Sequence, residues 1–136
     1  MFKFFMAILV WFYRRSGGKM AGRMGRTQII LLTTTGRKSG QTRTLPLGLF
    51  DWPGGYLVVA SNGGQPRHPA WYLNLMSDPH ATVQLLDHVI PVTAEVLTGE
   101  ARARAWQQVI TTAPSYAAYE KKTTRVIPLV LLRPTK

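Results

Sequence analysis

Residues 27–50, with the sequence TQIILLTTTGRKSGQTRTLPLGLF, contain two apolar runs separated by a short turn that has glycine at both ends. The first run, residues 27–35, is rich in β-branched residues and predicts a strand. In the turn, Gly36 and Gly40 are able to adopt a positive φ. Residues 41–50 alternate polar and apolar and predict a second strand, which Pro46 places at a sheet edge or a bulge. The segment therefore predicts a hairpin.

The rest of the chain predicts further short strands with helices between them. Apolar or alternating runs predict strands at residues 56–61, 81–86, 89–98 and 126–132. Helices are predicted at residues 69–78, from Glu100 to the break at Pro114, and at residues 115–122; Pro69 takes a favoured first helical position. In the longer helix a buried stripe is expected at Trp106, Val109, Ile110 and Ala113. About six strands in this order favour a mostly β fold, a small antiparallel barrel with peripheral helices, over a parallel doubly wound sheet.

The N-terminal residues 1–26 differ in composition from the domain predicted at residues 27–136. An apolar, aromatic-rich run from Phe2 to Tyr13 is interrupted only by Lys3, and a basic cluster follows it. As a helix the run would extend roughly 18 Å, too short for a hydrocarbon core of about 30 Å. It also lacks a small-residue cleavage site. A short apolar helix with basic residues favours attachment to an anionic membrane surface. The alternative is a helix that packs on its own domain or on a second subunit.

Charge and composition limit the function. The chain of 136 residues has 17 Lys and Arg against 6 Asp and Glu, a net charge of +11, which indicates an anionic partner. It has no cysteine, so disulfides and thiolate chemistry are excluded. The three histidines, His68, His80 and His88, lack the spacing of a metal site, and none is predicted. Neither a G-x-S-x-G motif nor a carboxylate pair suggests acid–base or acyl chemistry. If the protein is an enzyme, a cofactor carries the difficult step.

The basic turn is the candidate anion site. Its glycines are four residues apart and Gln41 follows, so the turn is not the G-x-x-x-x-G-K-[ST] phosphate loop, and the next segment is a strand. A glycine-bracketed turn can still direct N–H groups toward one point, and Arg37, Lys38 and Arg43 add charge. By pattern alone, a solvated basic turn is the favoured interpretation of these residues.

Three segments carry a family resemblance. LTTTGRKSGQTRTLPL (residues 32–47), VVASNGGQPRHPAWYLNL (58–75) and DPHATVQL (78–85) resemble, in this order and spacing, the deazaflavin (coenzyme F420)-dependent nitroreductase family. The similarity covers about residues 25–133. Members of that family are split β-barrel oxidoreductases of actinobacteria, with an FMN-binding-like fold. The resemblance implies coenzyme F420, an 8-hydroxy-5-deazaflavin, as the cofactor.

The resemblance also implies a set of site residues. The acidic tail of the cofactor would be bound by Arg37, Lys38, Ser39 and Arg43, and Thr44, Leu45 and Pro46 would run alongside the cofactor. The ring would be lined by Val59, Ala60, Ser61 and Asn62, and Ala70, Trp71 and Asn74 would close over it. Tyr116 and Tyr119 would border the substrate, and Ser61, Tyr116 or a water molecule would supply a proton. The competing interpretation is core packing for Trp71 and ordinary packing for both tyrosines, and for Tyr119 ordinary packing is favoured.

The implied reaction is hydride transfer from reduced coenzyme F420 to an electrophile such as a quinone or a nitro compound. Gly48 and Ala113 stand where bulkier aromatic residues suit a nitroaromatic pocket, which favours a membrane-soluble quinone, menaquinone first. We expect a cytoplasmic protein, peripheral on the inner face of the cell membrane through residues 1–26, with no nucleic-acid partner. Two alternatives stay open: a non-enzymatic basic module that binds lipid or nucleic acid, and an FMN-binding protein on the same fold.

Overall fold

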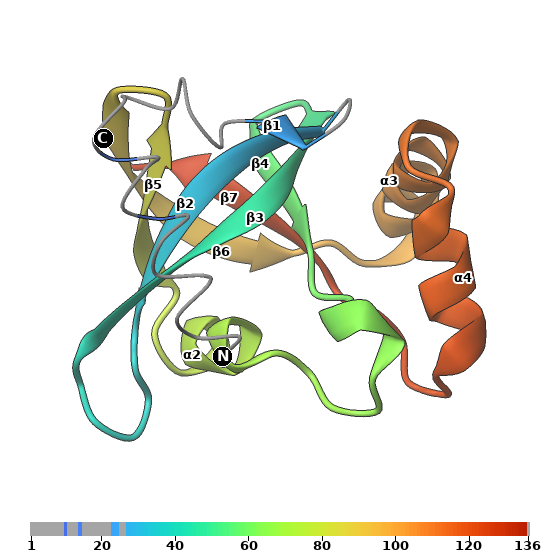
Figure 1. Ribbon diagram of the computed structural model, residues 1–136, viewed down its shortest axis with the longest axis horizontal. Coiled ribbons are helices and arrows are strands. Elements are labelled where there is room, and N and C mark those ends of the chain that lie inside the picture. Colours follow the sequence, from blue (N-terminus) through green and yellow to red (C-terminus); the bar gives the residue numbers. More distant parts are fainter. Residues whose placement is uncertain (1–9, 11–13, 15–22, 25–26, 136) are drawn as a thin grey trace.

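The predicted hairpin is the longest paired element of the protein. The computed structural model describes residues 10, 14, 23–24 and 27–135 (Figure 1). Strands β2 (Thr27–Thr35) and β3 (Thr42–Trp52) are antiparallel, and their register places Leu31 opposite Pro46. Both strands and the turn between them confirm the prediction from residues 27–50.

Six strands close into an antiparallel barrel. Besides β2 and β3 they are β4 (Gly55–Val59), β5 (His80–Leu85), β6 (His88–Val96) and β7 (Leu129–Pro134). The order is β2-β3-β4-β7-β6-β5, and β5 pairs with β2 to complete the ring. A two-residue strand, β1 (Arg23–Met24), adds to β2. The mostly β, split-barrel fold of about six strands is therefore confirmed.

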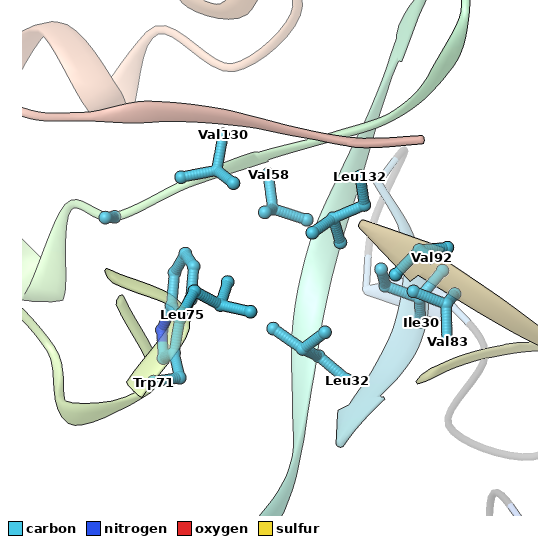
Figure 2. Packing of buried hydrophobic residues seen from close by; sticks show 10 residues of the cluster. Ile30, Leu32, Val58, Trp71, Leu75, Val83, Val92, Val130 and Leu132 are labelled. Atoms are coloured by element: carbon cyan, nitrogen blue, oxygen red, sulfur yellow. The ribbon is translucent and has the colours of Figure 1, made fainter. Parts of the chain in front are cut away.

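The barrel is split between β3 and β4, which pair only from Phe50 to Trp52. Among the described strands, Pro46 thus has a neighbour on the β2 side only, as expected for a residue without an N–H. Helix α2 (Ala70–Ser77) packs into the opening, where Trp71 and Leu75 lie beside the barrel interior (Figure 2). The split therefore brings α2 next to the hairpin.

Two apolar clusters hold the helices on the barrel. The first fills the interior and contains Ile30, Leu32, Val58, Ala60, Trp71, Leu75, Val83, Val92, Val130 and Leu132 (Figure 2). The second lies under α3 (Gly99–Thr112) and α4 (Ser115–Lys122), which sit together at one end of the molecule (Figure 1). Trp106 and Val109 of the predicted stripe are buried there, with Ile110 and Ala113 packed against them. The break at Pro114 is confirmed.

Several predicted boundaries are wrong; the strands predicted at residues 41–50 and 89–98, for example, are Thr42–Trp52 and His88–Val96. The third strand ends at Val59, because the chain turns into a 3₁₀ turn, η1 (Asn62–Gly64), and Ser61 lies outside the strand. Pro69 is the N-cap of α2, with ψ of 152°, and not its first helical residue. The last strand begins at Leu129 rather than at residue 126, since Pro128 and the residues before it form a separate connection from α4.

Two described residues of the predicted N-terminal segment contact the barrel. Val10 packs against Ile29 and Leu31, on the outer face of β2, and Arg14 Nη2 donates to Thr44 Oγ1 at 3.2 Å. At these two points the segment packs on its own domain, as the alternative interpretation expected. Strand β1 also lies within the predicted linker. The other residues of 1–26, and the division at residue 26, lie outside the described residues. No helix of the described chain is long and apolar enough to cross a membrane.

Candidate active site

The turn between β2 and β3 is held by its own backbone. Gly36 N donates to Gln41 O at 2.7 Å, Gly40 N donates to Gly36 O at 2.8 Å, and Gln41 N donates to Ser39 Oγ at 3.2 Å. Gly40 has a φ of +74°, whereas Gly36 does not adopt a positive φ. Gly36 is instead a place of close approach, since a Cβ there would lie 3.0 Å from Ser39 Oγ. The predicted convergence of N–H groups on an anion is thus wrong for these three amides.

The side chains of the turn provide the charge instead. Arg37, Lys38, Ser39 and Arg43 are exposed. Within the described part of the chain, no carboxylate forms an ion pair with any of the three cations. Guanidinium and ammonium groups without a carboxylate partner can bind carboxylate or phosphate oxygens. The predicted tail-binding residues therefore lie together and are accessible.

Asn74 of α2 fixes this turn to the rest of the site. Its side chain is only 4% exposed. Oδ1 accepts from Arg37 N at 3.1 Å and from Arg37 Nη1 at 3.4 Å, and Nδ2 donates to Thr34 Oγ1 at 3.1 Å. The amide group joins α2, β2 and the turn, a role that the sequence did not indicate. Its predicted contact with the cofactor stays a prediction.

We expect Asn74→Ala to lower the free energy of unfolding by about 1–2 kcal/mol, because a buried N–H and a buried hydroxyl lose their partner. It should also loosen the turn and increase exchange of the Arg37 amide proton. The control Thr34→Val removes only the bond to Nδ2 and should leave Arg37 protected. Hydrogen exchange and thermal unfolding measure both effects. Equal protection of Arg37 in the two variants would show that Asn74 does not hold the turn.

The predicted residues of β3 divide between the two faces of the strand. Leu45 packs against the interior cluster. Thr44 shares a hydrogen bond of 2.7 Å with Thr33 Oγ1 and also accepts from Arg14, which places it on the face covered by Val10. A ligand beside β3 would therefore meet Leu45 on one face and the Thr44 side chain on the other. Pro46 borders the open edge of the strand.

The segment after β4 is tightly folded. Val59, Ala60 and Ser61 are buried and Asn62 is partly buried. Asn62 has a φ of +48°, and its Nδ2 donates to Arg67 O at 3.0 Å. The four residues assigned to the cofactor ring thus lie at the end of the barrel from which α2 starts.

In α2, Ala70 is exposed, whereas Trp71 is only 5% exposed and belongs to the interior cluster. Core packing of Trp71 is what the competing interpretation expected. Its contact with a cofactor stays a prediction, and in this structure it belongs to the same interior cluster as Ala60.

Two tyrosines of α4 face the second cluster. The Tyr116 ring lies edge-on to Phe50, with centroids 5.4 Å apart, and edge-on to Tyr119 at 5.3 Å. Burial, and to a lesser extent Tyr119, raise the pKa of the Tyr116 phenol. The phenol is therefore neutral at neutral pH and can act as a hydrogen-bond donor. Tyr119 packs on the same cluster, as the simpler interpretation expected.

Two polar residues that the sequence did not single out complete this end of the molecule. Arg125 Nη2 donates to Ser61 O at 2.7 Å, and Arg125 Nη1 lies 2.9 Å from His68 Nδ1. Arg125 is an isolated arginine between two threonines and the last strand, so no spacing in the sequence indicated it.

A cavity of about 420 Å³ lies at the other end of β3. It is lined by Gln28, Leu49, Phe50, Asp51, Trp52, Pro53, Gly55, Tyr56, Leu85 and Gln108. None of the predicted site residues lines it, although Phe50 of its lining lies edge-on to the Tyr116 ring.

The protein thus combines a six-stranded split barrel, an exposed cationic hairpin and a partly buried phenol beside the second cluster, an arrangement that suits an anionic ligand. Residues 5–134 match the family model described as F420H(2)-dependent quinone reductase. An F420H(2)-dependent quinone reductase of Mycobacterium tuberculosis is 38% identical over 124 residues, which cover 88% of this chain and 83% of that protein.

Two solved structures are also similar. The F420-H2 dependent reductase FDR-A has a TM-score of 0.70 and 44% identity, covering 77% of this chain and 93% of that one. A structure described as a domain-swapped dimer has a TM-score of 0.74 and 38% identity, covering 93% and 95%. The chain belongs to the F420H(2)-dependent quinone reductase family.

The protein is therefore an oxidoreductase whose cofactor is coenzyme F420 and which transfers a hydride from the reduced coenzyme to an electrophilic acceptor. The resemblance stated from the three sequence segments, the cofactor and the enzyme class are confirmed. The family places the protein with enzymes rather than with non-enzymatic basic modules or FMN proteins.

Proposed function

We propose that the protein reduces a quinone with F420H2 and that the hairpin side chains Arg37, Lys38, Ser39 and Arg43 bind the acidic tail of the coenzyme. The observation that carries this is a group of three exposed cations that pair with no carboxylate among the described residues, on a turn that Asn74 joins to α2. The donors fit a polyanion, since each guanidinium or ammonium group can pair with a carboxylate or phosphate of the tail.

When bound, the reduced deazaflavin supplies a hydride. Residues of three segments would hold the ring in place and exclude water from it. They are Thr44, Leu45 and Pro46 of β3, Val59 to Asn62 at and after the end of β4, and Ala70, Trp71 and Asn74 of α2. Tyr116 or Ser61 holds the proton that the acceptor takes up. For Tyr116 the support is its position beside Phe50 and Tyr119, where burial raises its pKa and keeps the phenol neutral as a hydrogen-bond donor.

A quinone acceptor is supported by the relatives, which are described as quinone reductases, and by the small side chain at the edge of the tyrosine cluster. Ala113 packs on the second cluster with Tyr116 and Tyr119, and its methyl group leaves more room than an aromatic ring. We propose menaquinone as the physiological acceptor. We also propose that the protein is cytoplasmic and attaches to the anionic inner face of the membrane through its apolar, basic N-terminal residues.

We expect the full chain to oxidise F420H2 with a soluble short-chain quinone and, faster, with a long-chain quinone in vesicles that contain phosphatidylglycerol. Deletion of residues 2–9 ends before the Val10 contact, so the barrel should be retained. The deletion should lower turnover with the vesicle-bound quinone about tenfold or more, because membrane affinity is lost, and should leave turnover with the soluble quinone unchanged.

Phosphatidylcholine vesicles serve as the control for charge. Absence of turnover with either quinone would rule out the proposed acceptor. Equal turnover of the deletion variant and the full chain on anionic vesicles would rule out the membrane role of the N-terminal residues.

A further inference from the structure

Arg125 forms the densest set of polar contacts in the described chain. Its guanidinium donates from Nε to Gln65 O at 3.0 Å, from Nη1 to Ala60 O at 3.2 Å and from Nη2 to Ser61 O at 2.7 Å. Nη1 also lies 2.9 Å from His68 Nδ1. All four partners belong to residues 60–68, which connect β4 to α2. One side chain, from the connection between α4 and β7, thus binds this whole segment.

The segment needs such a partner. After Ala60 N donates to Pro128 O, the chain leaves the sheet, and three successive residues, Asn62, Gly63 and Gly64, have φ of +48°, +64° and +78°. Ala60 and Ser61 are both buried here, outside the strand. Ser61 O also accepts from Gly64 N at 2.9 Å, whereas the donor to Ala60 O is Arg125 Nη1 at 3.2 Å. A guanidinium group, with five donors in a planar fork, can satisfy several carbonyl groups at once.

The same contact defines the state of His68. An arginine side chain has no hydrogen-bond acceptor, so the atom that approaches Nδ1 is a donor and Nδ1 accepts. His68 is then neutral and has its proton on Nε2. Burial, and next the charge of Arg125, lower the pKa of His68, which agrees with this state. The centroid of the His68 ring also lies 4.8 Å from that of the Tyr72 ring of α2. Arg125 and Tyr72 are thus the titratable side chains that contact His68 among the described residues.

We propose that Arg125 is a positioning residue of the active site: it fixes the backbone that presents Ser61 and Asn62, and through His68 it fixes the start of α2. This inference rests on the proposed function, which assigns Ser61, Asn62 and α2 to the cofactor. His68 acts as the acceptor that orients the guanidinium and is held as the neutral Nε2–H tautomer.

The test variant is Arg125→Lys, which keeps the positive charge and so leaves long-range attraction for the acidic coenzyme in place. A single ammonium cannot reach three carbonyl groups and a ring nitrogen that the guanidinium reaches through three separate nitrogens. We expect the affinity for oxidised coenzyme F420, measured by calorimetry, to fall about tenfold. The matched control is Arg102→Lys. In the wild type, Arg102 Nη2 donates to a single carbonyl group, Ile127 O, at 2.8 Å, and this carbonyl lies outside residues 60–68. This control should lower the unfolding temperature without changing affinity.

The His68 ring gives a readout that does not depend on the coenzyme. Long-range ¹H–¹⁵N spectra of the full chain should show the proton on Nε2, and the ring should remain neutral below the ordinary histidine range near 6.5. In Arg125→Lys the tautomers should mix and the pKa should rise. If that variant does not fold, His68→Leu and His68→Asn replace it. Leucine removes the acceptor and should weaken coenzyme binding several-fold. Asparagine should retain most of the affinity, because its Oδ1 can accept in place of Nδ1.

The outcomes separate the two proposals. A wild-type chain that does not bind coenzyme F420 would contradict the proposed function, whatever the spectra show. A wild-type chain that binds it, with unchanged affinity in Arg125→Lys, would overturn the positioning role. A proton on Nδ1 of His68 in the wild type would overturn it as well.

Discussion

Replacing both Arg37 and Arg43 by alanine is expected to weaken the binding of oxidised coenzyme F420 about a hundredfold, the largest effect on affinity that we expect from any pair of surface residues. Both guanidinium groups are exposed and have no carboxylate partner in the described chain, so no internal ion pair is lost when they are removed. The free energy of unfolding should therefore change little, and the loss should appear almost entirely in binding.

The control for net charge is Arg104→Ala with Lys121→Ala, which removes two exposed cations from α3 and α4. Its affinity should stay within a few-fold of the wild type. Calorimetry at two salt concentrations adds a second criterion, since salt screens charge pairs and should weaken the wild type more than the hairpin variant. Equal losses in the hairpin variant and the control would mean that overall charge, and not this turn, attracts the coenzyme.

Gly64→Ala is expected to cause the largest loss of stability among the substitutions considered, about 2–4 kcal/mol in the free energy of unfolding. Gly64 has a φ of +78°, and a Cβ there would lie 3.0 Å from Tyr119 O, 3.1 Å from Lys122 Cβ and 3.2 Å from Tyr119 Cα. Two of these three atoms belong to the backbone of α4. A methyl group would therefore push α4 away from the segment after β4, in addition to straining the residue itself.

Gly63→Ala is a matched control in the same turn. Gly63 has a φ of +64°, and no atom lies within 4 Å of a Cβ built there, so only the cost of the left-handed conformation applies, about 1 kcal/mol. Thermal and denaturant unfolding of both variants measure the difference. Similar losses at the two positions would show that α4 does not press on Gly64.

Much of the functional prediction came from the resemblance of short segments, because the residues that define such a segment are neighbours in the sequence. Residues 32–47 form one hairpin, in which strand, turn and strand are neighbours in the sequence, so the cationic side chains are brought together by the turn itself. The contact between Asn74 and Arg37 joins residues 37 positions apart, and a pattern of neighbouring residues cannot report it. For the same reason the sequence left Trp71 open between core packing and cofactor contact, and only the fold shows that it belongs to the interior cluster.

By itself the sequence determined the strands, the turns between them, the break at Pro114 and the positive charge of the hairpin, because these depend on residues two to four positions apart. Only the tertiary structure decided which strands close the barrel, which face of β3 each side chain occupies, and that Arg125 binds a segment about 60 positions earlier in the chain. Buried carbonyl groups need a donor wherever the fold can bring one, and the distance along the chain does not limit that choice.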